Sequence, residues 1–118
     1  MEDIMIKKYI FGQPIETEAV VKQIEAEKEP PAVIAVDKQD GLTFTCKMEK
    51  EDVVYGLGEN VRGINKRGWL YESRCCDQPV HTEDKNSMYA SHNFIMLDGE
   101  RKFGLFFDYA GIISFDVG

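Results

Sequence analysis

The stretch Leu42–Lys47, which reads LTFTCK, alternates between apolar and polar side chains. Successive side chains of an extended chain point to opposite faces, so Leu42, Phe44 and Cys46 share one face. The threonines and the lysine share the other face. This alternation predicts a half-buried antiparallel strand whose apolar face packs on a core.

The same alternation recurs after Pro31 in short runs of β-branched and aromatic residues, spaced by about ten residues. Turn-forming residues separate the runs, notably Lys38–Gly41 and Asp98–Arg101. The pattern predicts a mainly β chain folded as an antiparallel β-sandwich. The other expected strands are Ala32–Val36, Asp52–Tyr55, Gly68–Glu72, Tyr89–Leu97, Phe103–Asp108 and Ile112–Val117.

The segment Glu16–Glu29 has a different pattern, with Val20 or Val21 and Ile24 at helical spacing among charged residues. Acidic residues stand in what would be its first turn, where they favour a helix. Pro30 and Pro31 then end the segment. We therefore expect one short α-helix at the N-terminus, over about residues 16–29, ahead of the strands.

Composition limits the classes of function. The chain has 118 residues, of which 43% are hydrophobic and 30% charged, as expected for one folded domain spanning residues 1–118. Its net charge of −7 argues against nucleic acid or an anionic membrane as partner. No signal peptide or membrane-spanning stretch is recognisable, so we expect a cytoplasmic protein whose three cysteines are reduced thiols.

The region Glu59–Met88 lacks regular alternation, and long irregular loops in small domains are often functional. Cysteine, histidine and acidic side chains gather there. Adjacent cysteines project in opposite directions on a strand, and no Cys-x-x-Cys pair occurs, so we expect neither a metal nor a cofactor. The side chains in and near this region that could in principle ligate a metal are those of Cys75, Cys76, Asp77, His81, Glu83, Asp84 and His92.

Two further motifs have both a functional and a structural interpretation. Gly56-Leu57-Gly58-Glu59 is only a partial match to a dinucleotide-binding loop, and we expect its glycines to let the chain bend. The carboxylate of Glu59 would then accept hydrogen bonds from loop amides. Trp69, Tyr71 and Tyr89 are either a platform for stacking sugars or residues of the core.

Four motifs occur in an order that resembles a known family. The chain resembles the N-terminal β-sandwich of glycoside hydrolase family 31, the α-glucosidase family, which has a galactose-mutarotase-like supersandwich. The resemblance extends over Val54–Val117, about half of the chain. The motifs are Val54–Glu59 (VYGLGE), Asp77–Pro79 (DQP), Met88–Phe94 (MYASHNF) and Phe103–Asp108 (FGLFFD).

The resemblance implies a non-catalytic role for this chain. Members of the family are retaining α-glycosidases, and the nucleophile and acid/base aspartates lie on a (β/α)8 barrel that follows the sandwich. The family's nucleophile motif is not found in this sequence, and we expect the barrel beyond Gly118. The whole enzyme is then expected to cleave terminal α-linked glucose from oligosaccharides, with an α-xylosidase as the alternative within the family.

The resemblance also implies one substrate-binding residue, Asp77. In the family, a loop of the sandwich reaches over the mouth of the barrel, and an aspartate on it hydrogen-bonds sugar hydroxyls; Asp77 matches that position. Two departures weaken the match: Cys76 stands where some members have arginine, and Asn93 follows His92 where proline is common. The alternative is that Asp77 is an exposed aspartate that caps a turn.

Two other functions fit the same residues. A free-standing carbohydrate-binding module would bind sugar through Trp69 or Tyr71, and a structural interaction domain would bind none. If the sandwich belongs to a larger enzyme, its isolated form exposes surface that the barrel normally covers. We therefore expect the isolated chain to self-associate through apolar surface or unpaired strand edges.

Overall fold

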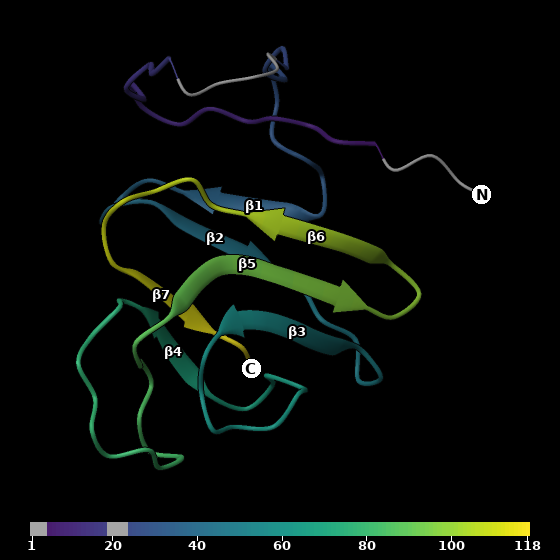
Figure 1. Cartoon of the computed structure of the whole chain (residues 1–118). Helices are drawn as coiled ribbons and strands as arrows, with labels where there is room; N and C mark the ends of the chain where they lie inside the picture. The colour runs from purple at the N-terminus through teal and green to yellow at the C-terminus, as the bar shows by residue number, and fades with distance from the viewer. Residues whose placement is uncertain (1–4, 19–23) are drawn as a thin grey trace. The chain divides into compact units, whose positions relative to one another are not determined.

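The computed structural model describes residues 5–18 and 24–118. These residues form two compact units, Met1–Lys47 and Met48–Gly118, which are described separately below. All the strands of the described part pair in antiparallel fashion (Figure 1). The strands are β1 (Ile34–Asp37), β2 (Thr43–Cys46), β3 (Val53–Gly58), β4 (Leu70–Ser73), β5 (Ser91–Asp98), β6 (Lys102–Phe106) and β7 (Ile113–Asp116).

The first unit contains the hairpin of β1 and β2, which pair from Ile34 opposite Cys46 to Asp37 opposite Thr43. The turn between them uses the expected chemistry, because the Asp37 carboxylate accepts a hydrogen bond of 2.8 Å from the backbone N–H of Gln39. Phe44 turns inward as its alternation predicts, and its ring meets that of Phe11 edge to face at 5.1 Å between centroids.

The predicted N-terminal helix over residues 16–29 is wrong. Residues 19–23 lie outside the described part, and none of the described residues is helical. In this segment Ala26 instead forms a parallel bridge with Lys8, and the backbone N–H of Glu27 donates to the carbonyl of Lys8 at 2.7 Å. The predicted helix is absent because the segment is short and has few apolar side chains. A helix of about 14 residues with two or three large apolar side chains is only marginally stable unless it packs on a core.

In the second unit, β3, β5 and β6 form a three-stranded sheet with β5 in the centre. The pairing of β3 with β5 shifts in register between Gly56 and Gly58. Both glycines have positive φ, 119° and 78°, and at each a Cβ atom would collide with the backbone of β5. This close approach of two strands accounts for the glycines, in agreement with the predicted bend.

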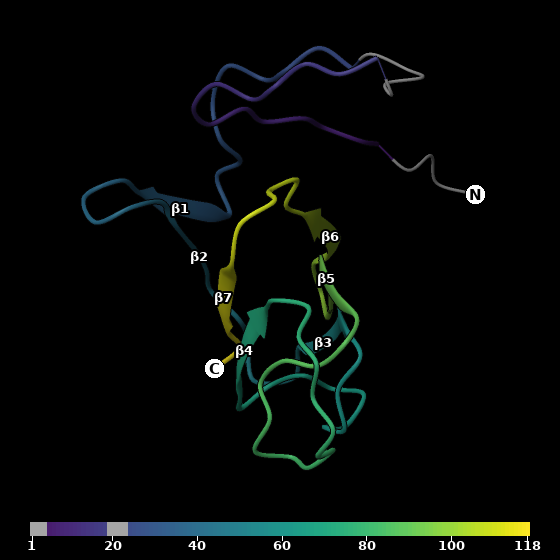
Figure 2. The ribbon, with the colours of Figure 1, turned by 60° about the vertical axis from the view of Figure 1, so that its left-hand side comes forward.

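Strands β4 and β7 form a second, two-stranded sheet. The two sheets of this unit lie as separate layers (Figure 2). Their inner faces enclose the core, in which Tyr71 is only 2% exposed. The core consists of Val54, Leu57, Tyr71, Phe115 and Val117, with Met48, Ile95, Phe107 and Ile113 packed against it. The layered β-sandwich and all seven predicted strands are therefore confirmed, with ends shifted by a few residues.

Candidate functional site

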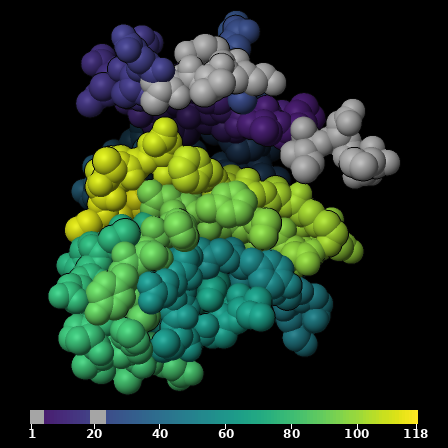
Figure 3. Space-filling model, viewed as in Figure 1, coloured from purple at the N-terminus to yellow at the C-terminus, as the bar shows by residue number. Residues whose placement is uncertain are grey.

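The segment of residues 74–90, between β4 and β5, carries most of the predicted site residues and is tied down at its base. The backbone N–H of Cys76 donates to the carbonyl of Met88 at 3.0 Å, and that of Glu72 donates to Asn86 at 2.9 Å. The Ser87 hydroxyl donates to the carbonyl of Arg74, and Met88 is fully buried. The segment extends from this base to one end of the unit, where its green atoms form the surface (Figure 3).

Asp77 lies just beyond this base and is exposed. Its carboxylate accepts a hydrogen bond from the Tyr89 phenol, and the pKa of Tyr89 is raised, first by desolvation and then by this carboxylate. The ring of His81 meets that of Tyr89 edge to face at 5.9 Å. A carboxylate, a phenol and an imidazole are thus displayed together on an exposed loop, and all three can hydrogen-bond sugar hydroxyls.

Two cationic side chains are buried in the adjacent loop, residues 59–69. Arg62 and Lys66 are each only 8% exposed. The Lys66 ammonium donates to the side-chain oxygen of Asn60 at 3.1 Å and to the carbonyl of Gly63 at 2.8 Å. Desolvation, followed by the nearby charge of Arg62, lowers the pKa of Lys66. The Tyr71 hydroxyl closes this cluster by donating to the carbonyl of Lys66 at 3.0 Å.

The lowered pKa of Lys66 predicts a pH dependence of stability. As pH rises from the lowered pKa towards 10.5, the folded state releases the Lys66 proton while the unfolded state still holds it, so Lys66 contributes increasing stability. We expect the free energy of unfolding to rise in this window relative to that of Lys66→Met. Urea unfolding of both proteins from pH 7 to 10.5 measures the difference; a difference independent of pH would contradict this prediction.

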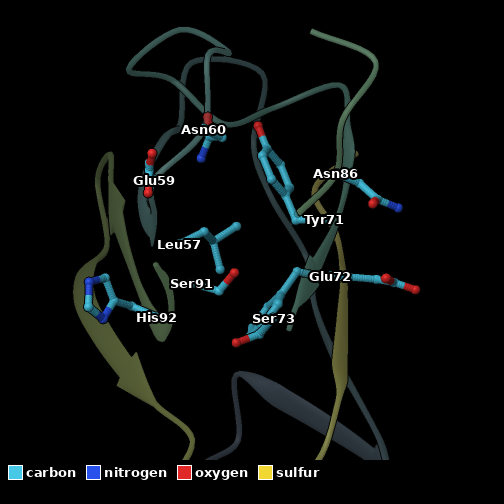
Figure 4. A pocket seen from close by; sticks show the side chains of 10 residues that line it. Leu57, Glu59, Asn60, Tyr71, Glu72, Ser73, Asn86, Ser91 and His92 are labelled. Atoms are coloured by element: carbon cyan, nitrogen blue, oxygen red, sulfur yellow. The ribbon is translucent and has the colours of Figure 1, made fainter. Parts of the chain in front are cut away.

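A narrow cleft separates the two sheets near this end of the unit (Figure 4). Leu57, Tyr71 and Ser91 line its interior, while the side chain of Glu72 points away from it. The cleft is too tight to admit a sugar ring, since it has no room even for a water molecule. The space between the two sheets at this cleft is therefore filled by the protein's own side chains.

The other residues that the sequence suggested for a metal or sugar site are accounted for by contacts within the fold. No group of three metal-ligating side chains occurs among residues 5–18 and 24–118. Tyr71 is buried in the core, so it is not part of an exposed sugar platform, and Trp69 is covered on one side by the guanidinium of Arg62 at 4.3 Å. The contact found at Glu59 differs from the expected one: its backbone N–H donates to the carbonyl of Ala90 at 2.7 Å.

Asn93, at the position where proline is common in the resembling family, joins three parts of the unit. Its side-chain oxygen accepts from the hydroxyl of Ser73 on β4, and its amide nitrogen donates to the carbonyl of Tyr109 at 3.0 Å. The Asn93 carbonyl accepts from the backbone N–H of Phe107 at 3.0 Å. Asparagine at this position thus links β5 to the second sheet, which a proline side chain could not do.

Two residues of the site region could not be identified from the sequence alone. From the sequence, Tyr89 is either a sugar-stacking residue or a core residue. Its link to Asp77 joins positions 12 apart across an irregular loop. No motif surrounds Arg62, and one of its hydrogen bonds reaches the carbonyl of Glu83, 21 residues away. A buried arginine gives no local periodic signal, because the acceptors of its hydrogen bonds are backbone carbonyls that any sequence supplies.

Comparison with known proteins identifies the family. The family model of the glycosyl hydrolase 31 N-terminal galactose mutarotase-like domain matches residues 12–116, which is most of the chain. A search of the curated proteins found no match. No helix of the described residues has the length and hydrophobicity of a membrane span. The match and the two-layered β fold confirm the resemblance found in the motifs, and the chain belongs to the glycosyl hydrolase 31 N-terminal galactose mutarotase-like domain family.

Proposed function

We propose that this domain serves a retaining α-glucosidase as its non-catalytic N-terminal part, and that the loop of residues 74–90 binds the α-glucoside substrate through Asp77. The chemistry is carried out by two aspartates of a catalytic barrel, which form and then hydrolyse a glycosyl-enzyme intermediate. Asp77 takes no proton. It holds sugar hydroxyls by charge-assisted hydrogen bonds and so places the scissile bond between the two aspartates.

The position of Asp77 carries this proposal. The residue is exposed on a loop whose base is hydrogen-bonded to β4, and its carboxylate interacts with the Tyr89 phenol. A fixed carboxylate loses little conformational entropy when it binds a sugar. A free-standing module that stacks sugar on Trp69 and Tyr71 is less well supported, because Tyr71 is buried. The cytoplasmic location stays a prediction from the sequence.

The purified chain is expected to show no turnover of maltose or of an aryl α-glucoside, because the barrel aspartates are not among its residues. Release of the aryl group measures this with high sensitivity, and a preparation from host cells carrying an empty vector controls for host enzymes. A retaining α-glucosidase activity is expected when the same chain is assayed as part of the enzyme with its barrel. Turnover by the purified chain alone, above the control, would contradict the proposal.

We also propose that the isolated chain self-associates through the outer face of the sheet of β3, β5 and β6. Register places Tyr55 opposite Met96 and Phe94 opposite Phe106, so their side chains share this face. Phe106 is 69% exposed and lies on the edge strand β6, and Met96 is 44% exposed. An apolar face beside an edge strand favours association between copies.

Sedimentation velocity at increasing concentration tests this association. We expect dimers or larger species in the wild-type chain, and fewer of them in Phe106→Lys, which places a charge on the face and the edge. Ile112→Lys is the matched control, because Ile112 is also exposed but lies outside this sheet. A wild-type chain that stays strictly monomeric at high concentration would contradict the prediction.

A further inference from the structure

Arg62 connects the two loops at the site end of the second unit, which lie side by side in Figures 1 and 2. Its Nε–H donates to the carbonyl of Glu83 at 2.9 Å, in the middle of the 74–90 loop and away from its base. Its Nη1–H donates to the carbonyl of Leu70 at 2.6 Å, on β4. One buried side chain of the 59–69 loop therefore ties the outer part of the substrate loop to the sheet.

Two aromatic rings hold the guanidinium of Arg62 in place. It lies 4.3 Å from the ring centre of Trp69 and 4.8 Å from that of Tyr71. Tyr71 belongs to the core, so the guanidinium packs directly on the hydrophobic core of the unit. A planar guanidinium can stack on rings while donating in two directions, which a lysine ammonium cannot reproduce.

The group that Arg62 holds is a turn. The backbone N–H of Lys85 donates to the carbonyl of Thr82 at 3.1 Å, and the Thr82 hydroxyl donates to the carboxylate of Asp84. Glu83 lies within this turn and presents its carbonyl to Arg62. Along the chain, Asp77 lies between the base of the loop, where Cys76 hydrogen-bonds Met88, and the turn that Arg62 contacts.

We propose that Arg62 is a positioning residue for substrate binding: by anchoring the turn of residues 82–85, it keeps Asp77 in the place where the sugar binds. The inference rests on the proposed function of Asp77. Arg62 itself contacts no sugar, because it is buried beneath the loop. Without the Arg62 side chain, the turn becomes mobile and Asp77 occupies several positions. Substrate binding is then weaker although the carboxylate is still present.

The first test measures the loop in the chain itself. In Arg62→Lys we expect the amide of Lys85 to exchange hydrogen about tenfold faster, since a hydrogen bond from a charged donor is lost at the turn. The fluorescence of Trp69, the one tryptophan of the sequence, should change as well, because its guanidinium neighbour is gone. Arg67→Lys is the matched control: Arg67 also donates to backbone carbonyls, those of Glu49, Lys50 and Asp52, but none lies in the substrate loop.

The second test measures coupling to Asp77 in the enzyme that carries this domain. We expect Arg62→Lys to raise KM for an aryl α-glucoside about tenfold with little change in kcat, and to have no further effect when Asp77 is already alanine. A merely structural role would lower the yield of folded enzyme and would act equally in both backgrounds. If Arg62→Lys does not fold, Arg62→Met keeps the apolar stem between the rings and removes both hydrogen bonds.

The outcomes separate this inference from the proposed function. Equal exchange of Lys85 in Arg62→Lys and Arg67→Lys would overturn the anchoring role, whatever the kinetics show. Faster exchange together with additive effects of Arg62→Lys and Asp77→Ala would overturn the link to substrate binding. An unchanged KM in Asp77→Ala itself would overturn the proposed function of Asp77, and with it the link, while leaving the anchoring role established by the exchange result.

Discussion

Gly56→Ala is expected to destabilise the second unit by about 3 kcal/mol or more, which is a large share of the stability of a small domain. Two costs combine at this position. The backbone has φ of 119°, a conformation that residues with a Cβ atom rarely adopt. The added Cβ would also overlap the carbonyl oxygen of Phe94 and would lie 3.1 Å from the Cα of Ile95, both on the central strand β5. Backbone atoms in a sheet cannot move aside cheaply.

Urea unfolding monitored by the fluorescence of Trp69 measures this effect, because Trp69 lies next to β4 in the same unit. Gly63→Ala is the matched control, since nothing lies within 4 Å of a Cβ atom built at Gly63. That variant is expected to change the free energy of unfolding by less than about 0.5 kcal/mol. Equal stabilities for the two variants would show that the close approach of β3 and β5 is not a constraint.

The strands could be predicted from the sequence because their signal is local. In β2 the inward side chains Phe44 and Cys46 alternate with outward threonines, and each turn carries its own Gly, Asp or Asn. The strand β3 was expected to stop at Tyr55 but continues to Gly58. Its last residues pair with β5 across an irregular register, which the local alternation does not encode.

The segment of residues 16–29 shows where local pattern fails. A few apolar residues at helical spacing among charges satisfy the periodicity without supplying enough buried surface to stabilise a helix. In the described residues of this segment, Ala26 pairs with Lys8, far earlier in the chain. Such pairing depends on the whole fold rather than on neighbouring residues, so the periodicity alone gave the wrong element.

The candidate site was predictable only in part. Asp77 was identified by a motif, and the structure places it on an exposed loop beside Tyr89. The contacts within and around this loop come from residues distant in sequence. Tyr89 lies at the C-terminal end of the loop, and Arg62 donates to Glu83 from a different loop. Both contacts depend on how the two loops pack, and no periodicity or short motif describes that packing.

Asp77→Ala is expected to lower kcat/KM of the enzyme for an aryl α-glucoside by about tenfold to a hundredfold. A hydrogen bond to a charged group contributes about 1.5 to 3 kcal/mol, which corresponds to this range. The lower kcat/KM should come mainly from a higher KM, because Asp77 binds hydroxyls that do not react. Asp77→Asn keeps the size of the side chain and can still hydrogen-bond, so its effect should be smaller.

Steady-state kinetics of the purified variants measures these ratios. Asp40→Ala is the matched control, because Asp40 is an exposed aspartate in the turn between β1 and β2. This variant removes one negative charge, as Asp77→Ala does. Its kcat/KM is expected to stay within about twofold of the wild-type value. An Asp77→Ala enzyme as active as the Asp40→Ala enzyme would show that Asp77 is an exposed loop residue without a part in binding.

The most direct test of a substrate-binding role for this domain is a crystal structure of the enzyme that contains it, with a glucose mimic bound at the catalytic barrel. We expect a carboxylate oxygen of Asp77 to lie about 2.7 Å from a sugar hydroxyl, with Tyr89 still donating to Asp77. A loop of residues 74–90 that points away from the sugar, with Asp77 in solvent, would contradict the account.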